Sequence, residues 1–106
     1  MTNPDVKTLV SHYRQSIDNI DAALINILAE RFRCTERVGH LKAQYGLPAR
    51  DEAREHAQLE RVRGIAAGAQ LSPDLAQEFL GFLLREMVKN HTAIALAQAG
   101  GEKAAS

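Results

Sequence analysis

The sequence has few of the features that mark secreted or membrane proteins. Its only cysteine is Cys34, so no disulfide can form within the chain, and there is no CxxC motif. No run reaches the ~18 apolar residues of a membrane span, and the N-terminus lacks the basic and apolar segments of a signal peptide. We therefore expect a cytoplasmic protein that does not insert into a membrane.

A surplus of charge of either sign is also missing, because 13 basic residues balance 13 acidic ones. Nucleic-acid-binding proteins usually carry a basic surplus, so we expect no nucleic-acid partner. The sequence also shows no nucleophile with an activating base, no pattern of metal ligands and no cofactor motif.

Strands are not expected, since no segment alternates strictly between apolar and polar residues. Glycine and proline fall mostly at joints, although Gly39 and Gly81 lie inside helical patterns at some cost. We predict an all-α chain of three helices, over about residues 5–43, over about 51–67, and from the N-cap Ser72 onward. We expect the 106 residues to form one domain, with a core over about 8–95 and a frayed tail over 97–106.

The first predicted helix carries an unusually long stripe at helical spacing. Its members are Val10, Tyr13, Ile17, Ile20, Leu24, Ile27, Arg31, Thr35, Val38 and Lys42. From residue 13 to residue 31 the steps alternate between 4 and 3, as in a heptad repeat. Such a helix is on the order of 55–60 Å long, and the other two helices could cover only part of it. We therefore expect a homodimer in which the long helices pack together.

Two cations, Arg31 and Lys42, occupy stripe positions where a buried helix would carry apolar residues. A charge on an apolar face is unfavourable unless it is paired. Three explanations are open: the side chains extend to the surface, they pair with Asp51 or Glu55, or they bind an anionic ligand. The guanidinium group of arginine is the usual partner of a carboxylate, so an anionic ligand remains one of the three explanations.

A third cation, Arg14, lies at the edge of the stripe, seventeen residues before Arg31. This separation is about 25 Å along a helix, too far for both side chains to hold one small molecule. Arg31 and Lys42 are closer, at roughly 16 Å along the axis. An antiparallel partner helix could bring Arg14 to them, so a shared site in the dimer is expected.

The second and third helices carry further candidates. Asp51 and Glu55 lie one turn apart at the start of the second helix, where acids can also simply complement the helix dipole. Met87 and His91 lie one turn apart on the third helix. His91 fits either a histidine at the margin of a core or a hydrogen-bond donor in a site.

Three segments together resemble the all-helical class of chorismate mutase. They are SIDNIDAALINILAERFRCTERVGHLK, PARDEAREHAQLERV and LSPDLAQEFLGFLLREMVKNH. The pattern is R-x-x-I-D-x-I-D, then L-x-x-R, V-x-x-x-K and R-D-x-x-R-E, and it is specific as a combination. The resemblance covers roughly residues 8–95.

The resemblance implies an intertwined helical homodimer with two equivalent active sites and no metal or cofactor. The family's substrate-binding positions fall on Arg14, Arg31, Lys42, Asp51, Arg54, Glu55, Met87 and His91. Arg14 is expected to reach the site of the other subunit, and Glu55 is expected to hold the substrate hydroxyl.

The implied reaction is the rearrangement of chorismate to prephenate, a step of phenylalanine and tyrosine biosynthesis. Arg14 and Arg31 suit the task of holding the two substrate carboxylates. Lys42 and His91 suit the stabilisation of negative charge on the ether oxygen as its bond breaks. The family usually has glutamine at the position of His91, which can also donate, and serine at that of Met87, which can only pack.

Two alternatives share the helical architecture. One is an isochorismate pyruvate-lyase of the same fold, which the sequence separates poorly from a mutase. The other is a non-catalytic helical dimerisation module, in which the stripe cations would form structural salt bridges.

Overall fold

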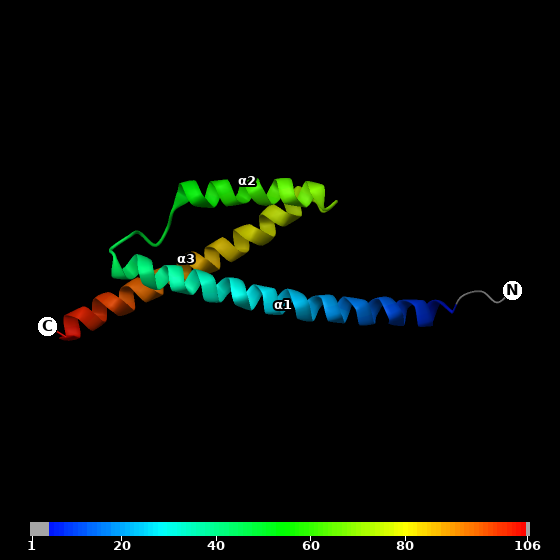
Figure 1. The fold of residues 1–106 in the computed structure, drawn as a ribbon, viewed down its shortest axis with the longest axis horizontal. Coiled ribbons are helices and arrows are strands. Elements are labelled where there is room, and N and C mark those ends of the chain that lie inside the picture. Colours follow the sequence, from blue (N-terminus) through cyan, green and yellow to red (C-terminus); the bar gives the residue numbers. More distant parts are fainter. Residues whose placement is uncertain (1–4, 106) are drawn as a thin grey trace. The chain divides into compact units, whose positions relative to one another are not determined.

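The computed structural model describes residues 5–105, and within this range it contains three α-helices and no strand (Figure 1). They are α1 (Val6–Gln44), α2 (Glu52–Gly68) and α3 (Pro73–Ala105). The predicted all-α, three-helix chain is confirmed. None of the described helices is long and apolar enough to cross a membrane.

The helix bounds lie close to those expected from the sequence, except at the C-terminus. α3 continues through Gly100 and Gly101 to Ala105, and so includes most of the segment predicted to fray. Ser106 lies outside the described residues.

The chain divides into two compact units, one up to Arg33 and the other from Cys34 onward. The division falls within α1, so this helix contributes residues to both units. Each unit is described by itself.

The first unit is the N-terminal part of α1, and its start is capped by Asp5. The Asp5 carboxylate accepts a hydrogen bond from the Thr8 hydroxyl at 2.8 Å and another from the Lys7 backbone amide at 3.0 Å. The hydrogen bond from the Thr8 hydroxyl, and to a lesser extent the one from the Lys7 amide, lowers the pKa of the Asp5 carboxyl below its ordinary value. The cap satisfies an otherwise free amide of the first turn.

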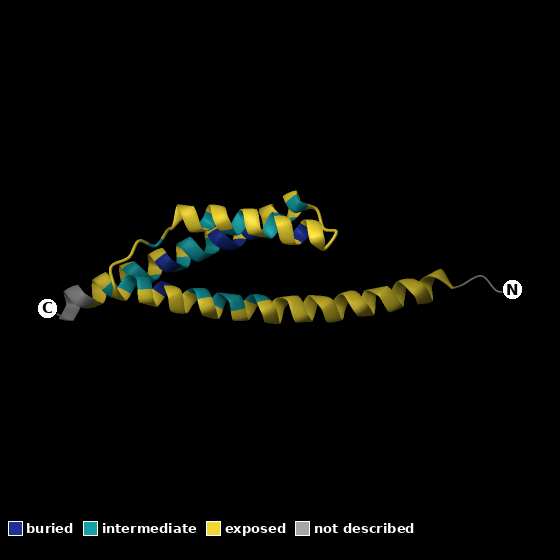
Figure 2. Ribbon diagram, turned by 45° about the horizontal axis from the view of Figure 1, so that its top comes forward, coloured by how far each residue is buried: buried dark blue, intermediate teal, exposed yellow. Residues whose placement is uncertain are grey.

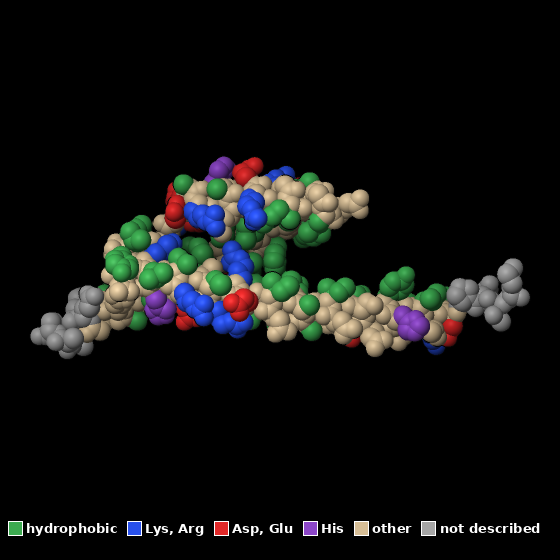
Figure 3. All heavy atoms as spheres, viewed as in Figure 1, with side chains coloured by type: hydrophobic (Ala, Val, Ile, Leu, Met, Phe, Trp, Pro, Cys, Tyr) green, Lys and Arg blue, Asp and Glu red, His purple; other side chains and the backbone are tan. Residues whose placement is uncertain are grey.

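Large apolar side chains along this part of α1 are exposed (Figures 2 and 3). They are Val6, Leu9, Val10, Tyr13, Ile17, Ile20, Leu24, Ile25 and Ile27. Many exposed apolar side chains along one helix are typical of a protein–protein interface.

The core of the second unit lies where α2 packs against α3. Ala66 of α2 and Leu80, Leu83 and Leu84 of α3 are buried there (Figure 2). α3 begins as the sequence predicts, because the Ser72 hydroxyl accepts a hydrogen bond from the Leu75 amide at 3.2 Å. The apolar face of α3 is thus the surface on which α2 packs.

α3 also packs on the C-terminal part of α1, within the same unit. His91 Nε2 lies 2.6 Å from the backbone carbonyl oxygen of Thr35, and the Gln98 amide donates to the Ala43 carbonyl at 3.3 Å. A side chain at Gly39 would collide with His91, so this glycine permits a close approach of the two helices.

Candidate active site

The two predicted site arginines of the first unit differ in exposure. Arg14 is exposed, whereas Arg31 is half-buried. Arg31 Nη1 is inaccessible to solvent and finds no hydrogen-bond partner among the described residues. A buried guanidinium N–H without a partner is unfavourable, and an anionic ligand would satisfy it.

In the second unit, Lys42 is half-buried in the last turn of α1. It lines a pocket of about 340 Å³ together with Leu47, Pro48, Arg50, Asp51 and Glu52. The chain turns here from α1 to α2: Gly46 has φ 67°, and the Leu47 amide donates to the Lys42 carbonyl at 2.8 Å. The turn therefore brings a lysine at the end of one helix to the acidic start of the next.

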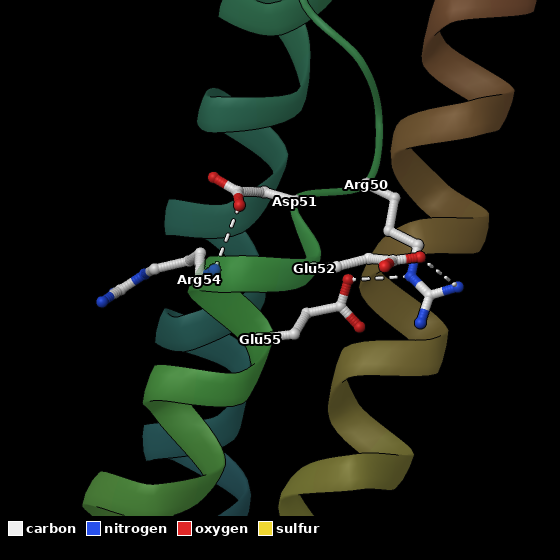
Figure 4. A network of polar contacts seen from close by, with 5 residues as sticks. All are labelled: Arg50, Asp51, Glu52, Arg54 and Glu55. Carbon is white, nitrogen blue, oxygen red and sulfur yellow. Dashed lines mark hydrogen bonds and ion pairs between the residues drawn. The ribbon is translucent and has the colours of Figure 1, made fainter.

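The start of α2 carries a network of polar contacts (Figure 4). Asp51 is the N-cap, and its carboxylate accepts from the Arg54 amide at 3.0 Å. Glu55 pairs with Arg50, with 3.1 Å between Nε and Oε2. Asp51 thus has the capping role that an acid at a helix start commonly takes, and Arg54 remains exposed.

His91 is buried, with 1% of its surface exposed. A carbonyl oxygen can only accept, so the proton of the bond to Thr35 belongs to His91 Nε2. The other ring nitrogen, Nδ1, is buried without a partner among the described residues. Met87, one turn earlier on α3, is half-buried.

The second unit therefore holds six of the eight predicted site residues: Lys42, Asp51, Arg54, Glu55, Met87 and His91. It brings Lys42 and Asp51 to one pocket and joins Asp51 to Arg54 by the capping bond. Arg14 and Arg31 belong to the first unit. Within the described part of the chain no cluster of three His, Cys, Asp or Glu residues could hold a metal ion.

Arg50 appears in the sequence only as the first residue of the pattern R-D-x-x-R-E, with no predicted role, and Gly39 only as an exception inside a helical pattern. Arg50 could have been noticed as a cation five residues before Glu55, across the first turn of a capped helix. Gly39 could have been noticed because a glycine inside a long helix usually has a packing reason.

Each unit by itself offers groups that could bind a polar ligand. In the second unit, Lys42 lines the pocket as a hydrogen-bond donor, and the Glu55 carboxylate, 14% exposed, is an acceptor. In the first unit, the partnerless N–H of Arg31 is a donor that suits an anionic oxygen.

Comparison with known proteins identifies the family. Residues 13–92 match the family described as chorismate mutase type II. The chain is 37% identical over 73 residues to the T-protein of Enterobacter agglomerans, covering 69% of this chain and 20% of that protein. It is 38% identical over 77 residues to the T-protein of Haemophilus influenzae, covering 73% and 20% respectively.

The chain thus spans about a fifth of the length of these two relatives. All eight predicted site residues, from Arg14 to His91, lie inside the matched range 13–92. With three helices and no strand in the described range, the fold agrees with the match. The chain belongs to the chorismate mutase type II family.

Proposed function

We propose that the protein catalyses the rearrangement of chorismate to prephenate, in the cytoplasm, as a step of phenylalanine and tyrosine biosynthesis. The family match over residues 13–92 carries this proposal. The partnerless buried N–H of Arg31 adds support, because it provides a donor that an anionic substrate would satisfy.

The reaction is unimolecular, so the protein has to hold the substrate in its folded, reactive shape. In our proposal, Arg14 and Arg31 bind the two carboxylates, and Glu55 accepts from the substrate hydroxyl. Asp51 and Arg54 form the adjoining edge of the site, and Met87 packs against the substrate.

Negative charge develops on the ether oxygen as the carbon–oxygen bond breaks, and fixed donors aimed at that oxygen accelerate the step. We assign this task to Lys42 and His91. Because His91 Nε2 donates to Thr35, the ring can offer a second N–H at Nδ1 only when both nitrogens are protonated.

We also propose that the active unit is a homodimer with two shared sites. The apolar side chains exposed along residues 6–27 would pack against the partner chain. Arg14 would reach the site of the partner, since it lies about 25 Å along the helix from Arg31 of its own chain.

The test is to incubate purified protein with chorismate and identify the product. Formation of prephenate supports the proposal, and absence of any conversion contradicts it. A parallel incubation with isochorismate, with detection of released pyruvate, separates the mutase from a lyase of the same fold. A non-catalytic module would show no conversion in either incubation and no thermal shift with chorismate.

A further inference from the structure

Arg50 contacts the side chain of Glu55, a proposed substrate-binding residue, and no role has so far been assigned to it. It is the last residue before the N-cap Asp51, and its side chain extends over the first turn of α2 to Glu55 (Figure 4). Arg50 Nε donates to Glu55 Oε2 at 3.1 Å. Its Nη1 also lies 3.6 Å from Glu52 Oε1.

The two acidic partners of Arg50 lie in different surroundings. The side chain of Glu52 is 79% exposed, whereas that of Glu55 is 14% exposed. Ion pairs in water contribute little, because solvent screens them and the side chains stay mobile. The pair with the enclosed carboxylate of Glu55 is screened less, so Arg50 acts mainly on Glu55.

The contact determines which oxygen of Glu55 is available. Arg50 contacts Oε2, and an ionised carboxylate can accept further hydrogen bonds at its other oxygen. A guanidinium that holds one oxygen also limits the rotation of the carboxylate, so the second oxygen keeps a defined direction.

We propose that Arg50 is a positioning residue, which holds the carboxylate of Glu55 in one orientation and directs its second oxygen toward the substrate hydroxyl. This inference rests on the proposed function, in which Glu55 binds that hydroxyl. Arg50 also lines the pocket that contains Lys42 and Asp51, so direct contact of Arg50 with the substrate is the competing explanation.

A double-mutant cycle separates the two explanations. The parent protein, Arg50→Gln, Glu55→Gln and the double variant are assayed for chorismate turnover, after circular dichroism shows that each is folded. Arg50→Gln should reduce kcat/KM by about tenfold or more, as expected for loss of a charged hydrogen bond. The loss should appear mainly as a higher KM. The Arg50–Glu55 bond positions a carboxylate that binds the substrate equally in the ground state and in the transition state.

If Arg50 acts through Glu55, Arg50→Gln should change kcat/KM by less than about twofold in the Glu55→Gln background. A full loss in that background would overturn the inference, because it would mean that Arg50 meets the substrate itself. Arg50→Lys should recover activity in part, since it keeps the charge but loses the planar fork.

One activity control accompanies the cycle. Lys89→Gln breaks an ion pair of the same 3.1 Å length, with Glu86 on α3, and should leave activity unchanged.

A readout without substrate tests the contact itself. The Arg50 Nε–H signal in a nitrogen–proton correlation spectrum should be protected from exchange in the parent protein. It should lose that protection in Glu55→Gln and keep it in Glu52→Gln; equal protection in all three would overturn the inference. A parent protein that does not convert chorismate would refute the proposed function, and this result precedes any variant.

Discussion

The imidazole of His91 fills the space that a side chain at Gly39 would need. A Cβ atom at Gly39 would lie 2.6 Å from His91 Cδ2 and 3.0 Å from Ile94 Cδ1. The same ring donates to the carbonyl of Thr35, one turn earlier on α1. Gly39 and His91 thus form a matched pair of small and large residues between α1 and α3, in the stretch of α1 that leads to Lys42.

Gly39→Ala should therefore destabilise the protein, although alanine favours helices more than glycine does. Overpacking of a close contact typically costs about 1–3 kcal/mol, against a gain of at most ~1 kcal/mol from helix propensity. Chemical denaturation measures the difference. The matched control is Gly64→Ala in α2, where nothing lies within 4 Å of the added Cβ and stability should hold or rise. Equal stability of both variants would contradict the close packing.

Replacement of His91 separates a donor role from a packing role. His91→Gln should stay active, because the amide can donate, whereas His91→Ala should lose on the order of 2–4 kcal/mol of transition-state stabilisation. Values of kcat well below the melting temperature of each variant provide the measurement. Near-normal turnover of folded His91→Ala would leave His91 as a core residue only.

Arg31→Met should reduce activity without reducing stability. Arg31 Nη1 is buried without a partner among the described residues, so removal of the charge leaves no carboxylate uncompensated. Each charged hydrogen bond to substrate contributes about 1.5–3 kcal/mol, so kcat/KM should fall at least about tenfold. The melting temperature should hold or rise. A variant that melts much earlier yet keeps its activity would show that Arg31 is structural.

A mixing experiment tests the shared sites of the proposed dimer. Arg14→Ala and Arg31→Ala should each be nearly inactive. If the two proteins are unfolded together and refolded, a mixed dimer should contain one site with both arginines, and part of the activity should return. No recovery, with mixed dimers demonstrated by mass spectrometry, would argue against sites built from both chains.

Much of the fold follows from the order of residues along the chain. The scarcity of glycine and proline inside the helices and the cap at Ser72 predict three helices with nearly the observed starts. That Asp51 caps the second helix is shown by the structure. Spacing also indicates which residues share a helix face, because the period of an α-helix is constant. The family motif could be recognised from the same spacing, and the roles of the eight site residues remain predictions for the experiments above.

Contacts between helices could not be read from spacing. His91 and Thr35 are 56 residues apart in the sequence, and their hydrogen bond depends on where α3 crosses α1. The partner of Glu55 could not be predicted from spacing either. Arg50 reaches Glu55 only because its side chain extends over the capped first turn of α2. A periodic pattern defines the faces of each helix, but side-chain packing and the course of the turns decide which faces and charges meet.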